Sequence, residues 1–276
     1  MRFALLASGS KGNCFLFYDE NTCLMIDCGT TVKYLKSCFE SLNTKISDLD
    51  AVLITHNHSD HIAQIRKFAD RPVYSPVQIG GIETIPVRPG GKFHVEHVTV
   101  TPLALSHDAG PTVGYILETW QNKLVYITDT GYLKDEYLPL IRGADYYILE
   151  SNHDVEMLMG TSRPQYLKAR IFSDTGHLCN EDCAAILEKA VTQRTRAVIL
   201  AHISQEANTR EAALAVSAEC LRHCPGVRKD LIIAAAGQYE MIKGGDWGEE
   251  TDYGSCCCTA GMEHLADLQP SEIIGS

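Results

Sequence analysis

The stretch LITHNHSDHI, residues 53–62, constrains this chain more than any other, because it places three histidines and an aspartate within six positions. The apolar run DAVLIT before it is typical of a buried strand, so His56 and His58 follow a strand end and point to the same side of an extended segment. Asp60 and His61 come at the turn into a helix and point elsewhere. Imidazole and carboxylate are donors for zinc, manganese and iron, so this spacing predicts two metal positions.

Later strand ends should supply further ligands, because four residues cannot complete two metal sites. His107, Asp129 and His202 each follow an apolar run, and the carboxylate of Asp129 could bridge two ions. The remaining histidines without such a setting are expected to be surface or structural residues: His94, His97, His223 and His264.

The rest of the chain alternates apolar and amphipathic runs. Strands are expected at 3–8, 14–19, 23–29, 50–55, 97–107, 113–119, 123–131, 145–151, 197–204 and 231–242, and helices at 31–42, 61–69, 180–191 and 209–224. Asn180 is expected to cap the third helix. Groups of strands followed by helices favour a layered α/β (α+β) fold, with two packed sheets and helices outside. We expect one domain over residues 1–242 and an irregular Gly-rich tail over 243–276.

Composition limits the classes of function. No apolar stretch approaches the roughly 18 residues of a membrane span, and the apolar run in MRFALLASGSKGN is short for a signal peptide, so a cytoplasmic protein is expected. The net charge of −11 argues against long electrostatic tracking along DNA. It does not exclude a nucleic-acid substrate, because metal ions can offset the negative charge at the site.

Eleven cysteines are scattered along the chain, and most are expected to be buried small hydrophobic residues in a reducing cytosol. The pairs Cys179/Cys183 and Cys220/Cys224 have helical spacing, so a second, structural zinc site stays open as an alternative.

The loop ASGSKGN, residues 7–13, favours a tight turn that presents backbone N–H and hydroxyl groups to an anion. Ser8, Ser10 and Asn13 are therefore candidates for substrate binding, and a plain hairpin turn is the alternative. The basic residues of SRPQYLKAR are either a local phosphate track or a solvated helix face: Arg163, Lys168 and Arg170.

The order H-x-H-x-D-H, then His, Asp and His at successive strand ends, resembles the metallo-β-lactamase fold. The segments LASGSKGNC, THNHSDH, SHDAGPTVGY, TDTG, ESNHDVEML and SDTGHLCNEDCA are similar to those of the YycJ/WalJ family, cytosolic metallohydrolases regarded as 5′-to-3′ DNA exonucleases. The resemblance reaches residue 242 and implies a four-layer αββα sandwich with two divalent ions, Zn²⁺, Mn²⁺ or Fe. It implies one ion held by His56, His58 and His107, a second held by Asp60, His61 and His202, and a bridge through Asp129.

The segment from Glu150 to His202 is also similar to tRNase Z, which implies a proton relay of Glu150 and His177. Two cations can generate hydroxide for phosphodiester hydrolysis, with Asp60 or the bridging aspartate receiving the proton of water. His177, oriented by Glu150, is then the candidate acid for the leaving oxygen. Asn152 and His153 follow the glutamate and are candidates for substrate contact.

Cys179 stands where the resemblance implies a serine, which puts a hydroxyl contact in doubt. The expected substrate is DNA, with RNA as a further candidate. A thioester or small-ester hydrolase of the glyoxalase II type shares the metal motif and remains the alternative, although it offers no reason for the Glu150/His177 pair.

Overall fold

The computed structural model describes residues 1–247 and 262–268 of the chain, so Cys256, Cys257 and Cys258 lie outside the described residues. The chain divides into two compact units. The first comprises residues 1–104, 109–121 and 237–260, and the second comprises residues 105–108, 122–236 and 261–276.

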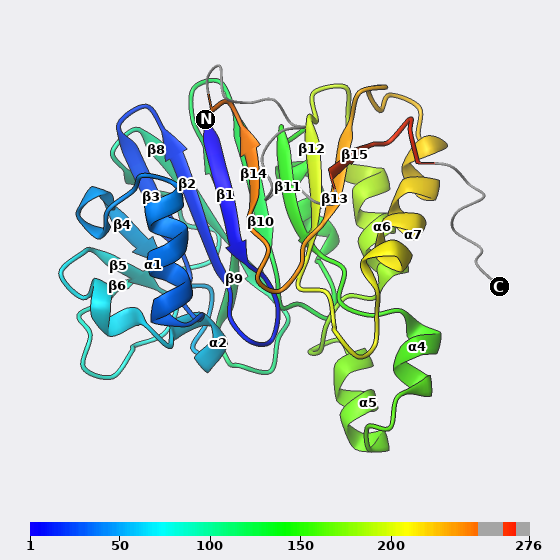
Figure 1. Cartoon of the computed structure of the whole chain (residues 1–276), viewed down its shortest axis with the longest axis horizontal. Coiled ribbons are helices and arrows are strands. Elements are labelled where there is room, and N and C mark those ends of the chain that lie inside the picture. Colours follow the sequence, from blue (N-terminus) through cyan, green and yellow to red (C-terminus); the bar gives the residue numbers. More distant parts are fainter. Residues whose placement is uncertain (248–261, 269–276) are drawn as a thin grey trace. The chain divides into compact units, whose positions relative to one another are not determined.

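The first unit is built on a sheet with the strand order β14-β1-β2-β3-β4-β5-β6 (Figure 1). Its strands are β1 (Arg2–Ala7), β2 (Cys14–Asp19), β3 (Thr22–Ile26), β4 (Ala51–Leu53), β5 (Val73–Ser75), β6 (Ile85–Pro86) and β14 (Ile242–Gly245). The neighbours from β14 to β3 pair antiparallel, and those from β3 to β6 pair parallel. Every residue of β2, β3 and β4 is buried, as their uninterrupted apolar sequences predict. The unit also contains β7 (Phe93–Val95), β8 (Val98–Leu105) and β9 (Thr112–Glu118).

The helix expected at 31–42 is confirmed as α1 (Val32–Ser41), whose buried Leu35 and Phe39 belong to the same hydrophobic cluster as Met25 and Val52. The helix expected at 61–69 is wrong in its bounds. The structure has a short α2 (Ser59–Ile62) and then a 3₁₀ turn (Ile65–Phe68), with another 3₁₀ turn at Ile46–Asp48. The reason is that Gln64 donates its backbone N–H to the carbonyl of Cys28, just after β3, instead of continuing the helix.

The second unit contains a run of parallel strands in the order β10-β11-β12-β13, with β15 antiparallel to β13 (Figure 1). These strands are β10 (Lys123–Ile127), β11 (Tyr146–Glu150), β12 (Ala197–Ala201), β13 (Ile232–Ala235) and β15 (Met262–His264). The helices are α3 (Leu138–Ile141), α4 (Val155–Gly160), α5 (Gln165–Phe172), α6 (Asn180–Ala190) and α7 (Arg210–Arg222), with a 3₁₀ turn at Asp135–Tyr137. Because the carboxyl ends of parallel strands meet at one edge, the residues just after β10, β11 and β12 become neighbours.

Two expectations need correction. The boundary expected at residue 242 falls inside β14, and β15 lies within the segment expected to be an irregular tail. Asn180 is not the cap of α6. The N-cap is Cys179, whose Sγ accepts the backbone N–H of Asp182 at 3.4 Å, while Asn180 is buried and bonds Ser151.

Candidate metal centre

In the first unit, the residues after the parallel strands β3 and β4 hold His61 in one orientation. Its Nδ1–H donates to Oδ2 of Asp27 at 2.7 Å. The backbone N–H of Thr55 donates to the other oxygen of Asp27 at 2.9 Å, and all three residues are fully buried. Burial raises the pKa of Asp27, and the imidazole of His61 opposes that rise. This network leaves the lone pair of His61 on Nε2, the nitrogen a metal ion would use.

His56 is oriented by the same network. Its Nδ1 lies 3.1 Å from Oγ1 of Thr55, whose hydroxyl donates to Asp27 at 2.8 Å, so His56 also carries its proton on Nδ1. The ring of His56 lies 4.7 Å from that of His58 and 4.0 Å from that of His61, between ring centroids. The three predicted histidines of the motif are therefore gathered in one small volume.

The carboxylate of Asp60 joins this group, since its Oδ2 lies 3.6 Å from Nε2 of His61. Three imidazoles and a carboxylate form a donor set that suits a divalent ion of zinc, manganese or iron. The expectation missed Asp27 and Thr55. Asp27 directly follows an apolar strand. An acidic residue after an apolar run is the pattern that identified Asp129 as a candidate, so the same pattern could have identified Asp27.

The loop at 7–13 supports the motif through Asn13. Its backbone N–H donates to the carbonyl of Asp60 at 2.8 Å, and its Nδ2 donates to Nε2 of His61 at 2.9 Å. A metal ion at that nitrogen would displace the Asn13 amide. Gly29 is needed beside them, because a Cβ there would lie 1.6 Å from the carbonyl oxygen of Asp60.

The backbone amides of the loop are largely occupied by protein acceptors. Gln238 holds the loop by accepting from Lys11 at 2.9 Å and donating to the carbonyl of Gly12 at 2.9 Å. The amides that donate within the protein are those of Ser8, Gly9, Lys11, Gly12 and Asn13. Ser8 is buried and Ser10 is exposed. These contacts favour a positioning role for the loop, and contact with substrate stays a prediction.

In the second unit, Asp129, Glu150 and His202 occupy the ends of β10, β11 and β12, as their places after apolar runs predict. Asp129 and His202 have φ of 60° and 55°, in the left-handed region that L-residues rarely adopt. Such strain is often found at functional sites. Oδ1 of Asp129 lies 3.4 Å from Nε2 of His202 and 4.0 Å from Nε2 of His107. Because Nδ1 of His107 donates to the carbonyl of Gly176 at 3.2 Å, its Nε2 lone pair also faces the aspartate.

Glu150 is fully buried and connects two imidazoles. Its Oε1 accepts from Nδ1 of His177 and from Nδ1 of His202, each at 2.8 Å. Its Oε2 accepts from the backbone N–H groups of Thr130 at 2.8 Å and Leu178 at 3.3 Å. Burial alone would raise the pKa of Glu150, but the two imidazoles lower it to about 2. The carboxylate is therefore ionised and turns Nε2 of both imidazoles outward.

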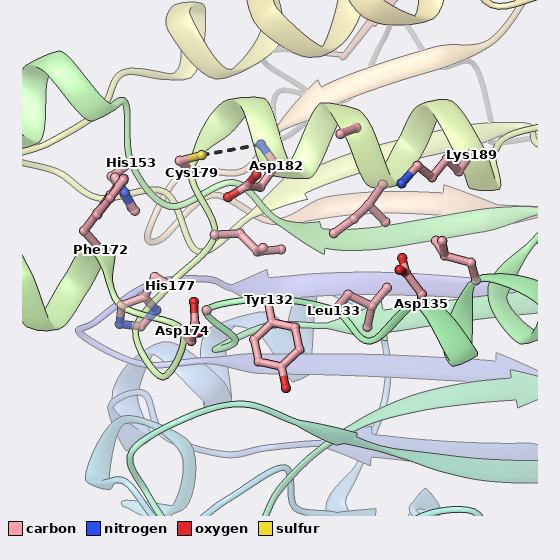
Figure 2. A pocket seen from close by; sticks show the side chains of 15 residues that line it. Tyr132, Leu133, Asp135, His153, Phe172, Asp174, His177, Cys179, Asp182 and Lys189 are labelled. Atoms are coloured by element: carbon pink, nitrogen blue, oxygen red, sulfur yellow. Dashed lines mark hydrogen bonds between the residues drawn. The ribbon is translucent and has the colours of Figure 1, made fainter.

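The other candidates of this unit make contacts with protein. Asn152 is buried and donates from Nδ2 to the carbonyl of His202 at 2.7 Å, which positions that candidate ligand. The three basic residues make contacts within the protein: Arg163 pairs with Glu206, Arg170 with Asp108, and Lys168 donates to the carbonyl of Met159. Contact of these residues with phosphate stays a prediction. His153 is buried beside the pocket shown in Figure 2.

The cysteines largely follow expectation, since six of the eight described are buried: Cys14, Cys23, Cys28, Cys38, Cys179 and Cys183. Cys220 and Cys224 lie within 4.8 Å, between donor atoms, of each other and of Glu188. That geometry keeps the alternative of a structural zinc site open for this pair.

Two thirds of the chain matches a known family. The profile of the β-lactamase superfamily domain matches residues 22–203. The exodeoxyribonuclease YycJ of Bacillus anthracis is 37% identical over 228 residues, which cover 77% of this chain and 86% of that protein. No helix among residues 1–247 and 262–268 is long and apolar enough to cross a membrane.

Two solved structures share the fold. The metallo-β-lactamase fold protein YhfI from Bacillus subtilis covers 88% of this chain and 99% of its own, with a TM-score of 0.66 at 18% identity. The short form of human tRNase Z covers 88% of this chain and 98% of its own, with a TM-score of 0.57 at 18% identity. The expected αββα fold class is therefore confirmed.

Proposed function

Since the chain belongs to the β-lactamase superfamily and is a metal-dependent hydrolase, we propose that it hydrolyses the phosphodiester bonds of DNA as a 5′-to-3′ exonuclease that uses two divalent ions. The ionised Glu150, which holds Nδ1–H of His177, is the observation that carries the proposal. An exodeoxyribonuclease relative at 37% identity supports it. The proposed catalytic domain, residues 1–242, contains the whole profile match and every candidate ligand.

The ligand assignment is the one that the resemblance implies. The first unit offers His56, His58, Asp60 and His61, and the second offers His107, Asp129 and His202. Four of the five histidines in these sets share one feature that supports the assignment: a protein acceptor holds Nδ1–H, so Nε2 is the ligating nitrogen in His56, His61, His107 and His202. When bound, two divalent ions would lower the pKa of a water molecule and stabilise charge on the phosphate. Zn²⁺, Mn²⁺ and Fe all suit these donors.

The proton transfers belong to the protein. Asp60 or Asp129 takes the proton of the attacking water. His177 gives the proton on Nε2 to the leaving 3′ oxygen, a step that general acids typically accelerate about 10²–10⁴-fold. The negative charge of Glu150 stabilises the imidazolium before that transfer. Asp129 also lies 3.9 Å from Nδ1 of His177, between Oδ1 and nitrogen, and adds to this stabilisation.

The alternative, a thioester hydrolase of the glyoxalase II type, does not need His177 to protonate the leaving group. A thiolate leaves without protonation, because the thiol pKa is about 8.5. An alkoxide leaving group is far more basic and needs the proton. A relay held by a fully buried carboxylate therefore favours the phosphodiester substrate.

The proposed location is the cytosol. The eight cysteines among the described residues are all free thiols, which supports a reducing compartment.

The test is a nuclease assay across Zn²⁺, Mn²⁺ and Fe²⁺ with DNA labelled at either end, with matched RNA and with a thioester. The proposal expects mononucleotides to appear first from the 5′ end of DNA. Release from the 3′ end would overturn the polarity, and turnover of the thioester alone would replace the proposed function by the alternative.

A further inference from the structure

A pocket of about 350 Å³ lies in the second unit directly beside His177 (Figure 2). Figure 2 shows His177, His153 and Phe172 at one end and Asp135 and Lys189 at the other, with α6 along one side. Pockets for small molecules begin at about 300 Å³, so this one suits one nucleotide unit and not a duplex.

His153 is the feature that points to a ligand. Its side chain is 1% exposed and neither ring nitrogen has a hydrogen-bond partner in the structure. Burial lowers the pKa of His153, so the ring is neutral and offers one donor and one acceptor. Buried polar groups without partners cost free energy, and ligand binding is one reason for such a group to persist. Its backbone is fixed, because its carbonyl accepts from Asn180 at 2.9 Å.

Phe172, the last residue of α5, packs edge-on against His153 with 6.1 Å between ring centroids. The Phe172 side chain is 53% exposed, unlike the imidazole it packs against. An exposed ring changes rotamer readily, so Phe172 can turn to uncover the imidazole and offer its own face to a planar ligand. Tyr132 adds a second aromatic side chain to the lining, and it is 43% exposed.

The charges of the pocket disfavour phosphate as its occupant. Asp135, Asp174 and Asp182 line it, and Lys189 supplies the one ammonium group among the lining residues. Carboxylates repel a phosphate but accept hydrogen bonds from the ring N–H and amino groups of an uncharged heterocycle. Aromatic faces beside such acceptors are the usual means of holding a nucleobase without strict sequence preference.

We propose that this pocket binds the base of the departing nucleotide, stacked on Phe172 with its edge against His153. The inference rests on the proposed function and deepens it. The leaving oxygen belongs to the sugar of that nucleotide, so a base in the pocket places the sugar beside the general acid His177. Holding a single departing unit in this way explains release of one nucleotide at a time.

The experiment compares kcat/KM on two DNA substrates that differ only at the 5′-terminal nucleotide, which carries a base in one and is abasic in the other. Stacking of a base on an aromatic side chain corresponds to about 5- to 160-fold in binding. The wild-type protein should lose that factor on the abasic substrate. On the natural substrate, Phe172→Ala should lower kcat/KM by the same factor relative to the wild type. On the abasic substrate, its kcat/KM should be close to that of the wild type. His153→Phe should behave in the same way.

Tyr166→Ala is the matched control, because Tyr166 is an exposed aromatic residue of the same helix and does not line the pocket. Its kcat/KM should equal that of the wild type on both substrates. Phe172→Ala removes an exposed side chain, so it tests the pocket even if His153→Phe fails to fold.

Binding of deoxyadenosine to the metal-free protein, measured by calorimetry, gives a readout besides turnover. The expected result is saturable binding that Phe172→Ala weakens and inorganic phosphate does not displace. Failure of deoxyadenosine to bind, or an equal loss by Phe172→Ala on both DNA substrates, would overturn the inference. Absence of hydrolysis of either DNA by the wild type would instead reject the proposed function.

Discussion

His177 and His202 share one oxygen of Glu150, which lies 2.8 Å from Nδ1 of each ring. One imidazole is the proposed general acid and the other is a proposed metal ligand. The same buried carboxylate therefore orients both the proposed proton donor and a proposed metal ligand, so a substitution of Glu150 should affect both proposed functions.

Glu150→Gln should lower the stability of the protein as well as its rate of DNA hydrolysis. The new amide N–H₂ would face either the backbone donors Thr130 and Leu178 or the imidazole donors, leaving buried hydrogen bonds unmade. A cost of about 1–3 kcal/mol in the free energy of unfolding is expected. Urea denaturation measures it, with the exposed Glu156→Gln of α4 as control. A stability equal to that of the control would show that the carboxylate charge is dispensable.

His177→Ala should slow DNA hydrolysis about 10²–10⁴-fold in kcat and leave metal content unchanged. An activated nitrophenyl phosphodiester needs no proton for its leaving group, so the variant should nearly recover on it. Steady-state kinetics on both substrates measure this difference. Equal losses would mean that His177 binds phosphate or supports the structure, and the relay would have to be abandoned.

Asp27→Asn should weaken metal binding about 10- to 100-fold, because residues that orient a ligating histidine typically contribute that much. The physical cause is loss of the charge that holds Nδ1–H of His61. Competition with a chromophoric chelator measures the affinity. Asp70→Asn, at an exposed position, is the control, and an unchanged affinity in Asp27→Asn would exclude the orienting role.

Asp129→Ala should lower the metal content below the proposed two ions per chain and abolish most activity. Its carboxylate lies near the Nε2 atoms of both His107 and His202, so its removal affects each candidate ligand. His94→Ala should retain full content, since His94 is exposed and contacts Thr99. Elemental analysis after metal loading measures both variants, and a single ion in the wild type would contradict the dinuclear proposal.

His153 should make stability depend on pH. Its pKa in the folded protein is lowered, so below the ordinary value of about 6.5 the unfolded chain takes up a proton that the folded chain does not. Stability is complete above that pH and declines, by at most about 1.4 kcal/mol per pH unit, until the folded-state pKa is reached. His153→Gln removes this slope, so the unfolding free energy of the wild type should fall relative to that of the variant as the pH is lowered from 8 to 5. His223→Gln, at an exposed residue outside the pocket, controls for the substitution of a histidine.

Local sequence patterns predicted that the candidate ligands His107, Asp129 and His202 lie near the ends of apolar strands, and the structure places them there. Their role as metal ligands stays a prediction. Local patterns were insufficient for the groups that hold the candidate ligands. Asp27 meets Thr55 only because β3 and β4 are parallel neighbours, and Gln238 meets the loop at 7–13 from 226 residues away. The end of α2 depends likewise on a bond from Gln64 to Cys28. These contacts depend on which distant segments of the chain pair with each other. The periodicity of apolar residues gives no information about that pairing.

The hydrogen bonds by which Gln238 holds the loop at 7–13 have a consequence for how the protein matures. A ribosome makes His56 and His61 early, but the residue that fixes the loop beneath them emerges only near the end of translation. Until then Asn13 lacks the support that sets it against His61. The local geometry around His61 is therefore complete only after Gln238 has been synthesised and has joined the loop.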